Sequence, residues 1–193
     1  HGDMDDWPFR NAEGRFEAVA WLREPVIDYL DGWPLVTGNE ITARFVGASM
    51  DVGGSVKETG GVPVDEVRAL IDDMKAPRLE ITYSSATDLP GLMGFFQASP
   101  LDEQVNVDLS QFDLAGPADI TGRITVPLGK TAGELEVDGG VLVKGGRFRH
   151  PEQDFDISDI RGLLRYTERG FFGNDLNGET LGEAITIDLR ADA

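Results

Sequence analysis

Few residues in this sequence have the type and spacing that catalysis requires. None of the 193 residues is cysteine, which excludes disulfides, thiolate nucleophiles, zinc ribbons and iron–sulfur clusters. The histidines are His1, which with Gly2 is typical of a cloning-tag remnant, and His150, which precedes Pro151 in a polar segment. A serine–histidine–acid triad would depend on His150, for which a surface turn is the simpler interpretation. We therefore expect no catalytic residue and no enzyme.

The acidic residues are numerous but form no recognisable site. Asp and Glu total 35, so carboxylate pairs occur throughout and none stands out as a glycosidase dyad. Asp175-Leu176-Asn177-Gly178 matches part of a calcium loop, but it lacks the further oxygen ligands and the closing Glu, so a hairpin turn explains it. The paired glycines lie between predicted strands and not between a strand and a helix, which excludes a phosphate-binding loop. We expect no metal and no cofactor.

The tryptophans are the remaining candidates for ligand contact. Trp7, Trp21 and Trp33 could stack on sugars, yet all three fall in the first 33 residues. Buried packing is the simpler expectation for each, because an indole ring contributes a large apolar area to a core.

Charge and composition exclude several classes of protein. Lys and Arg total 17 against 35 acidic residues, a formal net charge of −18. Such a chain lacks the basic surface that nucleic acids or anionic membranes attract. The longest apolar runs are too short to span a bilayer. With 24 Gly, 10 Pro and 40% hydrophobic residues, the chain is too apolar for a disordered linker and too rich in turns for a helical bundle.

Alternation of apolar and polar residues is the dominant pattern, and it predicts strands with one apolar face and one charged face. The clearest cases are Leu79–Tyr83, Arg123–Val126, Glu134–Asp138 and Ala184–Arg190. Weaker cases are Arg15–Leu22, Glu40–Val46, Met50–Val56, Val141–Lys144, Asp154–Ile157 and Ile160–Tyr166. We predict hairpin connections at Gly60-Gly61, Gly139-Gly140, Gly145-Gly146 and Asn177-Gly178.

Two segments depart from this alternation. Asp88–Gln97 is apolar on nearly all sides and begins with an N-cap residue and an early proline, which predicts a short buried helix that ends before Ser99-Pro100. Asp65–Asp73 is compatible with both the helical and the strand period, so the pattern leaves its structure open.

The two halves of the chain repeat the same order of elements. Ile41 and Ile160 are 119 residues apart, and Met50 and Phe171 are 121 residues apart. We therefore predict one continuous segment over 7–193, with a β-meander module at 7–87, a second at 111–193, and a helical insert at 88–110 between them. Residues 1–6 are expected to be a disordered terminus or tag remnant.

The apolar face of such a sheet has two possible roles. It is the core of a closed sandwich, or it is the lining of an open groove that attracts hydrocarbon chains. The period alone leaves both open. The residues predicted to line a groove are Leu79, Ile81, Tyr83, Ile124, Val126, Leu135, Val137, Ile160, Leu164, Ile185, Ile187 and Leu189. Leu92, Phe95 and Phe96 of the predicted helix would cap the groove or complete the core.

Several motifs resemble the large YhdP-like members of the bacterial AsmA-like family. They are Trp7-Pro8-Phe9, Glu13–Ala18, Tyr29 with Gly32-Trp33-Pro34, Ala98–Leu101 and Ile160–Gly170. The resemblance covers roughly Trp7 to Leu189, and Ala98–Leu101 and Asp159–Gly170 are its most specific parts. It carries no catalytic residue across, and it favours a strand for Glu66–Asp72.

The resemblance implies a curved, mostly antiparallel β-sheet that forms an open, taco-like groove. It also implies a periplasmic protein anchored in the inner membrane that moves phospholipid toward the outer membrane, with this chain as an internal segment without the anchor. The expected partners are phospholipid acyl chains and neighbouring segments of the same chain, and no nucleic acid. The alternatives are a scaffold or assembly factor of outer-membrane biogenesis, which offers a strand edge, or a β-domain that binds a carbohydrate or protein through its tryptophans.

Overall fold

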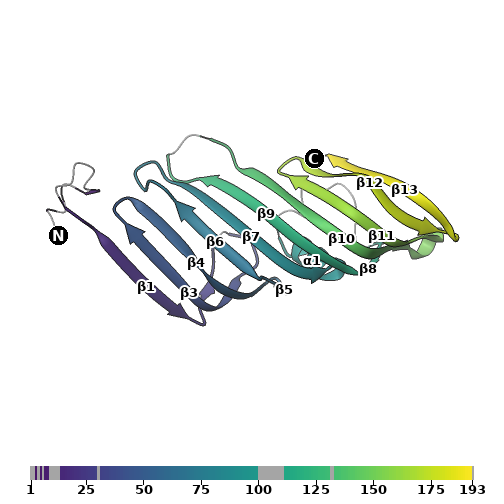
Figure 1. Cartoon of the computed structure of the whole chain (residues 1–193), viewed down its shortest axis with the longest axis horizontal. Coiled ribbons are helices and arrows are strands. Elements are labelled where there is room, and N and C mark those ends of the chain that lie inside the picture. The colour runs from purple at the N-terminus through teal and green to yellow at the C-terminus, as the bar shows by residue number, and fades with distance from the viewer. Residues whose placement is uncertain are drawn as a thin grey trace.

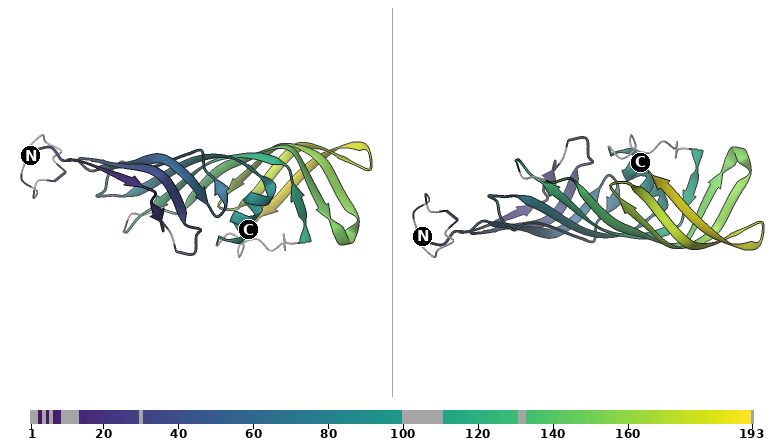
Figure 2. Two further views of the ribbon diagram at one scale, coloured as in Figure 1. Left: turned by 90° about the horizontal axis from the view of Figure 1, so that it is seen from below. Right: turned by 90° about the horizontal axis from the view of Figure 1, so that it is seen from above.

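A computed structural model describes residues 3, 5, 7–8, 14–29, 31–99, 111–130 and 133–192. The described residues form one open antiparallel sheet, which does not close into a barrel, and one α-helix on one side of it (Figures 1 and 2). Figure 2 also shows that the sheet is twisted and curved. The predicted fold class, a curved and mostly β structure with one short helix, is therefore confirmed. Phe9, Glu13 and Pro100-Leu101 of the quoted motifs lie outside the described residues.

Ten strands follow one another across the sheet, and three short strands pair beside them. In order across the sheet, the ten are β1 (Glu17–Arg23), β3 (Val36–Val46), β4 (Ser49–Thr59), β6 (Glu66–Ile71), β7 (Arg78–Asp88), β9 (Pro117–Pro127), β10 (Glu136–His150), β11 (Phe155–Thr167), β12 (Gly170–Thr180) and β13 (Glu183–Asp192). The short strands are β2 (Val26–Ile27), β5 (Val62–Pro63) and β8 (Asp113–Ala115). The segment that the period left open is β6, a strand, as the resemblance favoured.

Strand register places the apolar side chains on one face. Residues directly opposite in an antiparallel pair point to the same side, and the alternation within each strand fixes the rest. Ile81 lies opposite Ala69 and Ile124, and Ile124 lies opposite Val137. Charged residues such as Glu80 and Arg123 alternate with these and lie on the opposite side. We call the two sides the apolar face and the outer face.

Three of the four predicted hairpin connections are wrong. Gly60-Gly61 forms the turn that follows β4, as predicted. Gly139-Gly140 and Gly145-Gly146 instead lie inside the 15-residue strand β10, and Asn177-Gly178 lies inside β12. At Gly139 a Cβ atom would lie 2.2 Å from Cζ of Tyr166, so this glycine provides room for a ring and not a turn. Gly146 lies at a break in the register of β10 against β11.

The predicted helix is α1 (Leu89–Gln97), and it begins as the sequence predicts. Asp88 is extended, and its carboxylate accepts a hydrogen bond from the Gly91 backbone N–H at 2.7 Å. Pro90 lies in the first turn, where no helical hydrogen bond is lost. Because α1 directly follows β7, the chain turns at the end of that strand onto the apolar face.

The predicted duplication remains a prediction. Five long strands precede α1 and five follow it. The pairs Ile41–Ile160 and Met50–Phe171 would equate β3 with β11 and β4 with β12, which are neighbouring strands in each half. Strand β1 lies next to β3 in the sheet, and the strand that lies next to β11 on the corresponding side is β10. The duplication would therefore equate β1 with β10 and not with β9. Residues 100–110 of the predicted insert lie outside the described part of the chain.

Candidate functional site

Apolar side chains from several neighbouring strands lie together on the apolar face. Rows of apolar side chains run across the strands from β3 to β10, as the register shows. One row consists of Ala43, Val52, Ala69, Ile81, Ile124 and Val137. The next consists of Phe45, Met50, Ile71, Leu79 and Val126. The face is thus continuous over neighbouring strands and is not a single small pocket.

Most of these side chains are only partly buried. Leu79, Ile81, Ile124, Val126 and Val137 all remain partly exposed. No large side chain among the described residues is completely buried. In a closed sandwich a second sheet would cover such positions, so the described part of the chain has the exposure of an open sheet.

Eleven of the twelve groove residues predicted from the sequence fall into three groups, and Leu135 stands apart. Leu79, Ile81, Tyr83, Ile124, Val126 and Val137 lie together on the apolar face of β7, β9 and β10. Ile185, Ile187 and Leu189 lie on β13, where they oppose Gly178, Leu176 and Gly173 of β12. Ile160 and Leu164 pack on the buried cluster of Ala118, Val141 and Val143 together with Leu89 and Leu92 of α1. Leu135 precedes β10, and 46% of its surface is exposed.

The helix covers the middle of the apolar face. Leu89 and Leu92 contact the cluster around Ala118, whose own surface is completely buried. The Phe96 ring is buried and lies 6.0 Å from the ring of Phe171 on β12. The Phe95 ring lies 6.1 Å from that of Trp33, in the segment before β3. Helix α1 thus contacts residues that come both before and after it in the sequence.

Seven aromatic side chains form two runs of contacts that meet at the adjacent residues Phe95 and Phe96 of α1, and together we call them the aromatic belt. Their order is Tyr29, Trp33, Phe95, Phe96, Phe171, Tyr166 and Tyr83. The distances between ring centroids are 6.3 Å for Tyr29–Trp33 and 6.4 Å for Tyr166–Phe171. The belt contains all three tyrosines of the sequence. Sequence reasoning missed it as a site, because its members are far apart along the chain.

Two tyrosines at one end of the belt, Tyr83 on β7 and Tyr166 on β11, meet over the intervening strands β9 and β10. The Tyr83 and Tyr166 hydroxyls are 2.6 Å apart, and the Tyr166 hydroxyl donates to the backbone carbonyl of Thr121 at 3.1 Å. Their rings lie over Gly122 and Gly139, where a Cβ atom would come within 2.6 Å of tyrosine atoms. These strand glycines are the one sequence signal that could have revealed the pair.

Burial shifts the ionisation of all three tyrosines in the same direction. Desolvation raises the pKa of Tyr83, because the phenolate would lose water that the phenol does not need. Desolvation and the neighbouring Tyr83 both raise the pKa of Tyr166. Desolvation raises the pKa of Tyr29, and a hydrogen bond with Thr59 partly opposes this rise. The hydroxyls are therefore neutral at physiological pH and act only through hydrogen bonds.

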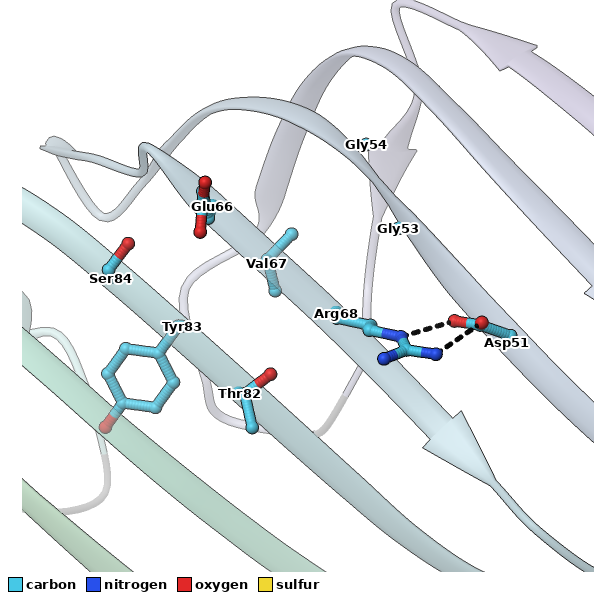
Figure 3. A pocket seen from close by; sticks show the side chains of 9 residues that line it. All are labelled: Asp51, Gly53, Gly54, Glu66, Val67, Arg68, Thr82, Tyr83 and Ser84. Atoms are coloured by element: carbon cyan, nitrogen blue, oxygen red, sulfur yellow. Dashed lines mark hydrogen bonds and ion pairs between the residues drawn. The ribbon is translucent and has the colours of Figure 1, made fainter.

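Cross-strand ion pairs characterise the outer face. Arg68 binds Asp51 through two hydrogen bonds of 2.9 and 2.7 Å, which lower the pKa of that carboxyl (Figure 3). A depression of about 460 Å³ lies beside this pair and is lined by polar side chains such as Glu66, Thr82 and Ser84 (Figure 3). Other outer pairs are Arg44–Glu17, Arg123–Glu80 and Lys144–Asp119. These pairs are exposed, so each stabilises the fold only weakly.

Two sequence interpretations of single residues are wrong. His150 is not in a surface turn but is 5% exposed at the end of β10, with its ring edge-on to Phe112 at 5.2 Å. Trp21 is not packed but is 71% exposed, because it lies on the outer face of β1 opposite Thr42. Trp7 donates to the Gly47 carbonyl at 3.0 Å, and Trp33 belongs to the aromatic belt.

The described residues offer neither a cluster of metal ligands nor a membrane-spanning helix. Within the described ranges no three or more His, Asp or Glu side chains come together as metal ligands. Nor does any helix in those ranges have the length and hydrophobicity to cross a bilayer.

Comparisons with known proteins agree with this geometry. The family model described as "YhdP protein" matches residues 1–193. The "Intermembrane phospholipid transporter YhdP" of Escherichia coli (strain K12) is 23% identical over 189 residues, which cover 97% of this chain. The chain spans only 15% of the length of that relative. No solved structure matches. A family match over the whole chain and an open β-sheet with a continuous apolar face lead to one conclusion: the chain belongs to the YhdP protein family.

Proposed function

We propose that the apolar face binds phospholipid acyl chains and is one segment of a periplasmic path between the inner and outer membranes. The observation that carries this proposal is the continuous row of partly exposed apolar side chains across neighbouring strands. Covering this apolar area with acyl chains would lower the free energy by about 25 cal/mol for each Å² removed from water. Lipid headgroups would remain in water beside the strand ends. Membership of a family with a phospholipid transporter supports the same assignment.

The edges of the sheet support a role as one segment of a longer path. In the described part of the chain, β1 pairs only with β3, and β13 pairs only with β12. Each therefore offers a row of unpaired backbone groups to a further strand. We propose that neighbouring segments of the same protein continue the sheet at these edges, with the whole protein anchored in the inner membrane.

Charge substitutions on the two faces of one strand test the lipid assignment. Ile187 lies on the apolar face of β13, and the adjacent Thr186 lies on its outer face. Ile187→Lys should strongly reduce the phospholipid that copurifies with the protein, because a lysine beside hydrocarbon is desolvated without a partner. Thr186→Lys is the matched control and should leave the bound phospholipid unchanged.

A second pair of variants repeats the test on a strand in the middle of the sheet. Val126→Asp places a charge on the apolar face of β9, and Thr125→Asp places it one residue away on the outer face. Native mass spectrometry would count bound phospholipids, with circular dichroism to verify folding. Equal phospholipid binding by both members of each pair would contradict the proposal.

A further inference from the structure

The aromatic belt and α1 lie between two uncovered parts of the apolar face. On one side are Leu79, Ile81, Ile124, Val126 and Val137, which we call the β7–β10 surface. On the other side are Ile185, Ile187 and Leu189, which we call the β13 surface. All eight side chains remain at least partly exposed.

The residues under α1, which we call the covered stretch, are Ala118, Val141, Val143, Ile160 and Leu164, and they differ from both surfaces in their burial. Ala118, Val141 and Val143 are buried, with exposures of 0%, 8% and 3%. Leu89 and Leu92 of α1, together with Ile160 and Leu164, complete this cluster. Its apolar area is already removed from water by the protein itself. An acyl chain would therefore gain nothing there unless α1 moved away.

The aromatic belt extends this coverage on both sides of the helix. Phe96 contacts Phe171 on β12, and Phe95 contacts Trp33 before β3. Tyr166 then connects Phe171 to Tyr83 on β7 through the hydroxyl pair. Tyr83, Tyr166 and Phe171 occupy one row across the strands, with Gly122 and Gly139 between the two tyrosines. This row lies next to the one that contains Ile81, Ile124 and Val137.

We propose that α1 and the aromatic belt divide the apolar face into two separate acyl-chain sites, one on the β7–β10 surface and one on the β13 surface. This inference rests on the proposed function. A phospholipid would occupy either site with α1 in place, and passage between them would require α1 to leave the cluster around Ala118.

The composition of α1 suits a removable cover. Its sequence, Leu-Pro-Gly-Leu-Met-Gly-Phe-Phe-Gln, contains no charged residue. Two glycines and a proline in nine residues make the isolated helix unstable, so its packing and the Asp88 cap hold it in place. Hydrocarbon could replace the same apolar contacts without leaving a buried charge unpaired.

Mapping of lipid contacts tests the division. Protein purified from cells would be loaded with phosphatidylethanolamine that carries a diazirine near the end of one acyl chain, and labelled peptides would be identified by mass spectrometry. We expect labelling of the β7–β10 and β13 surfaces to exceed that of Val141, Val143, Ile160 and Leu164 at least tenfold. Equal labelling of the covered stretch would overturn the division but not the proposed function. Labelling of neither exposed surface would overturn both.

Truncation of two apolar side chains of α1 provides a second test of the division. Leu92→Ala combined with Phe96→Ala should raise labelling of the covered stretch to the level of the exposed surfaces. Gln97→Ala is the control, because Gln97 is exposed at the end of the helix. Circular dichroism would verify folding of each variant. A folded double variant whose covered stretch stays unlabelled would contradict the division. If the double variant fails to fold, the map of the unmodified protein decides alone.

Discussion

At the scale of single residues, a tyrosine pair connects two distant strands across the apolar face. The Tyr83 and Tyr166 hydroxyls form a hydrogen bond between β7 and β11, although β9 and β10 separate these strands. The pair exists because Gly122 and Gly139 leave room for the rings. From the sequence alone such glycines are interpreted as turns. Glycine is common both in turns and at sites where another group approaches the backbone closely, and the sequence does not distinguish the two. The alternation of Leu79–Tyr83 predicted the strand, but it could not predict the partner of Tyr83.

The two hydroxyls of the pair should contribute unequally to stability. Tyr166 donates its proton to the Thr121 carbonyl, so Tyr83 must donate to Tyr166. Tyr166→Phe leaves the Tyr83 donor without a partner and should lower the free energy of unfolding by about 1–3 kcal/mol. Tyr83→Phe leaves the Tyr166 bond to Thr121 intact and should cost less. Urea unfolding of both variants measures this difference, and a larger loss for Tyr83→Phe would contradict the assigned donor order.

Ionisation of the tyrosines should appear as alkaline instability. The pKa values of Tyr29, Tyr83 and Tyr166 are raised in the folded protein, above about 10 in the unfolded chain. A raised folded pKa stabilises the fold below the unfolded pKa, and this contribution is lost as the pH rises above about 10. Ultraviolet titration should show little phenolate at pH 10 in the folded protein and about half-ionised tyrosine in urea. Ordinary titration of Tyr83 and Tyr166 in the folded state would refute their burial.

At the scale of elements, α1 and β10 show what local sequence can predict. The start of α1 was predictable, because the Asp88 cap and Pro90 are local signals. The full length of β10 was not, because its glycines interrupt the apolar pattern at positions where Tyr166 and the break in register require them. The position of α1 on the cluster around Ala118 depends on contacts distant in sequence, and no local pattern reports these.

Two glycine substitutions distinguish the roles of glycine in these elements. Gly139→Ala would place a methyl group 2.2 Å from a ring atom of Tyr166 and should destabilise the fold by about 1–3 kcal/mol. Gly94→Ala lies on the exposed side of α1 with no atom within 4 Å of the new methyl, and should stabilise the fold by up to about 1 kcal/mol. Thermal denaturation of both variants checks the two signs. A stabilising Gly139→Ala would show that the ring does not lie where we describe it.

At the scale of the whole molecule, the sheet combines an acidic exterior with an uncovered apolar face. The net charge of −18 opposes association between copies of such a surface by electrostatic repulsion. Composition and alternation together predicted this two-sided sheet. They could not predict whether the face is open, because openness depends on what lies opposite the sheet and not on the period of its strands.

Stability should therefore vary along the sheet, with a maximum under α1. Strands β9 and β10 are paired on both sides and contribute the buried Ala118, Val141 and Val143. Strand β1 is paired on one side and is exposed over most of its length. Hydrogen exchange of the 193-residue chain should be slowest in β9 and β10 and fastest in β1 and β13, because single-sided strands open locally at low cost.

The same measurement in a longer form of the protein tests the continuation of the sheet. If neighbouring segments pair with β1 and β13, exchange there should slow at least tenfold, while exchange in β9 and β10 changes little. The β9 and β10 amides serve as the internal control for a general change in stability. Edge strands that exchange equally fast in both forms would show that the sheet ends at β1 and β13, and would leave the two acyl-chain sites within one isolated domain.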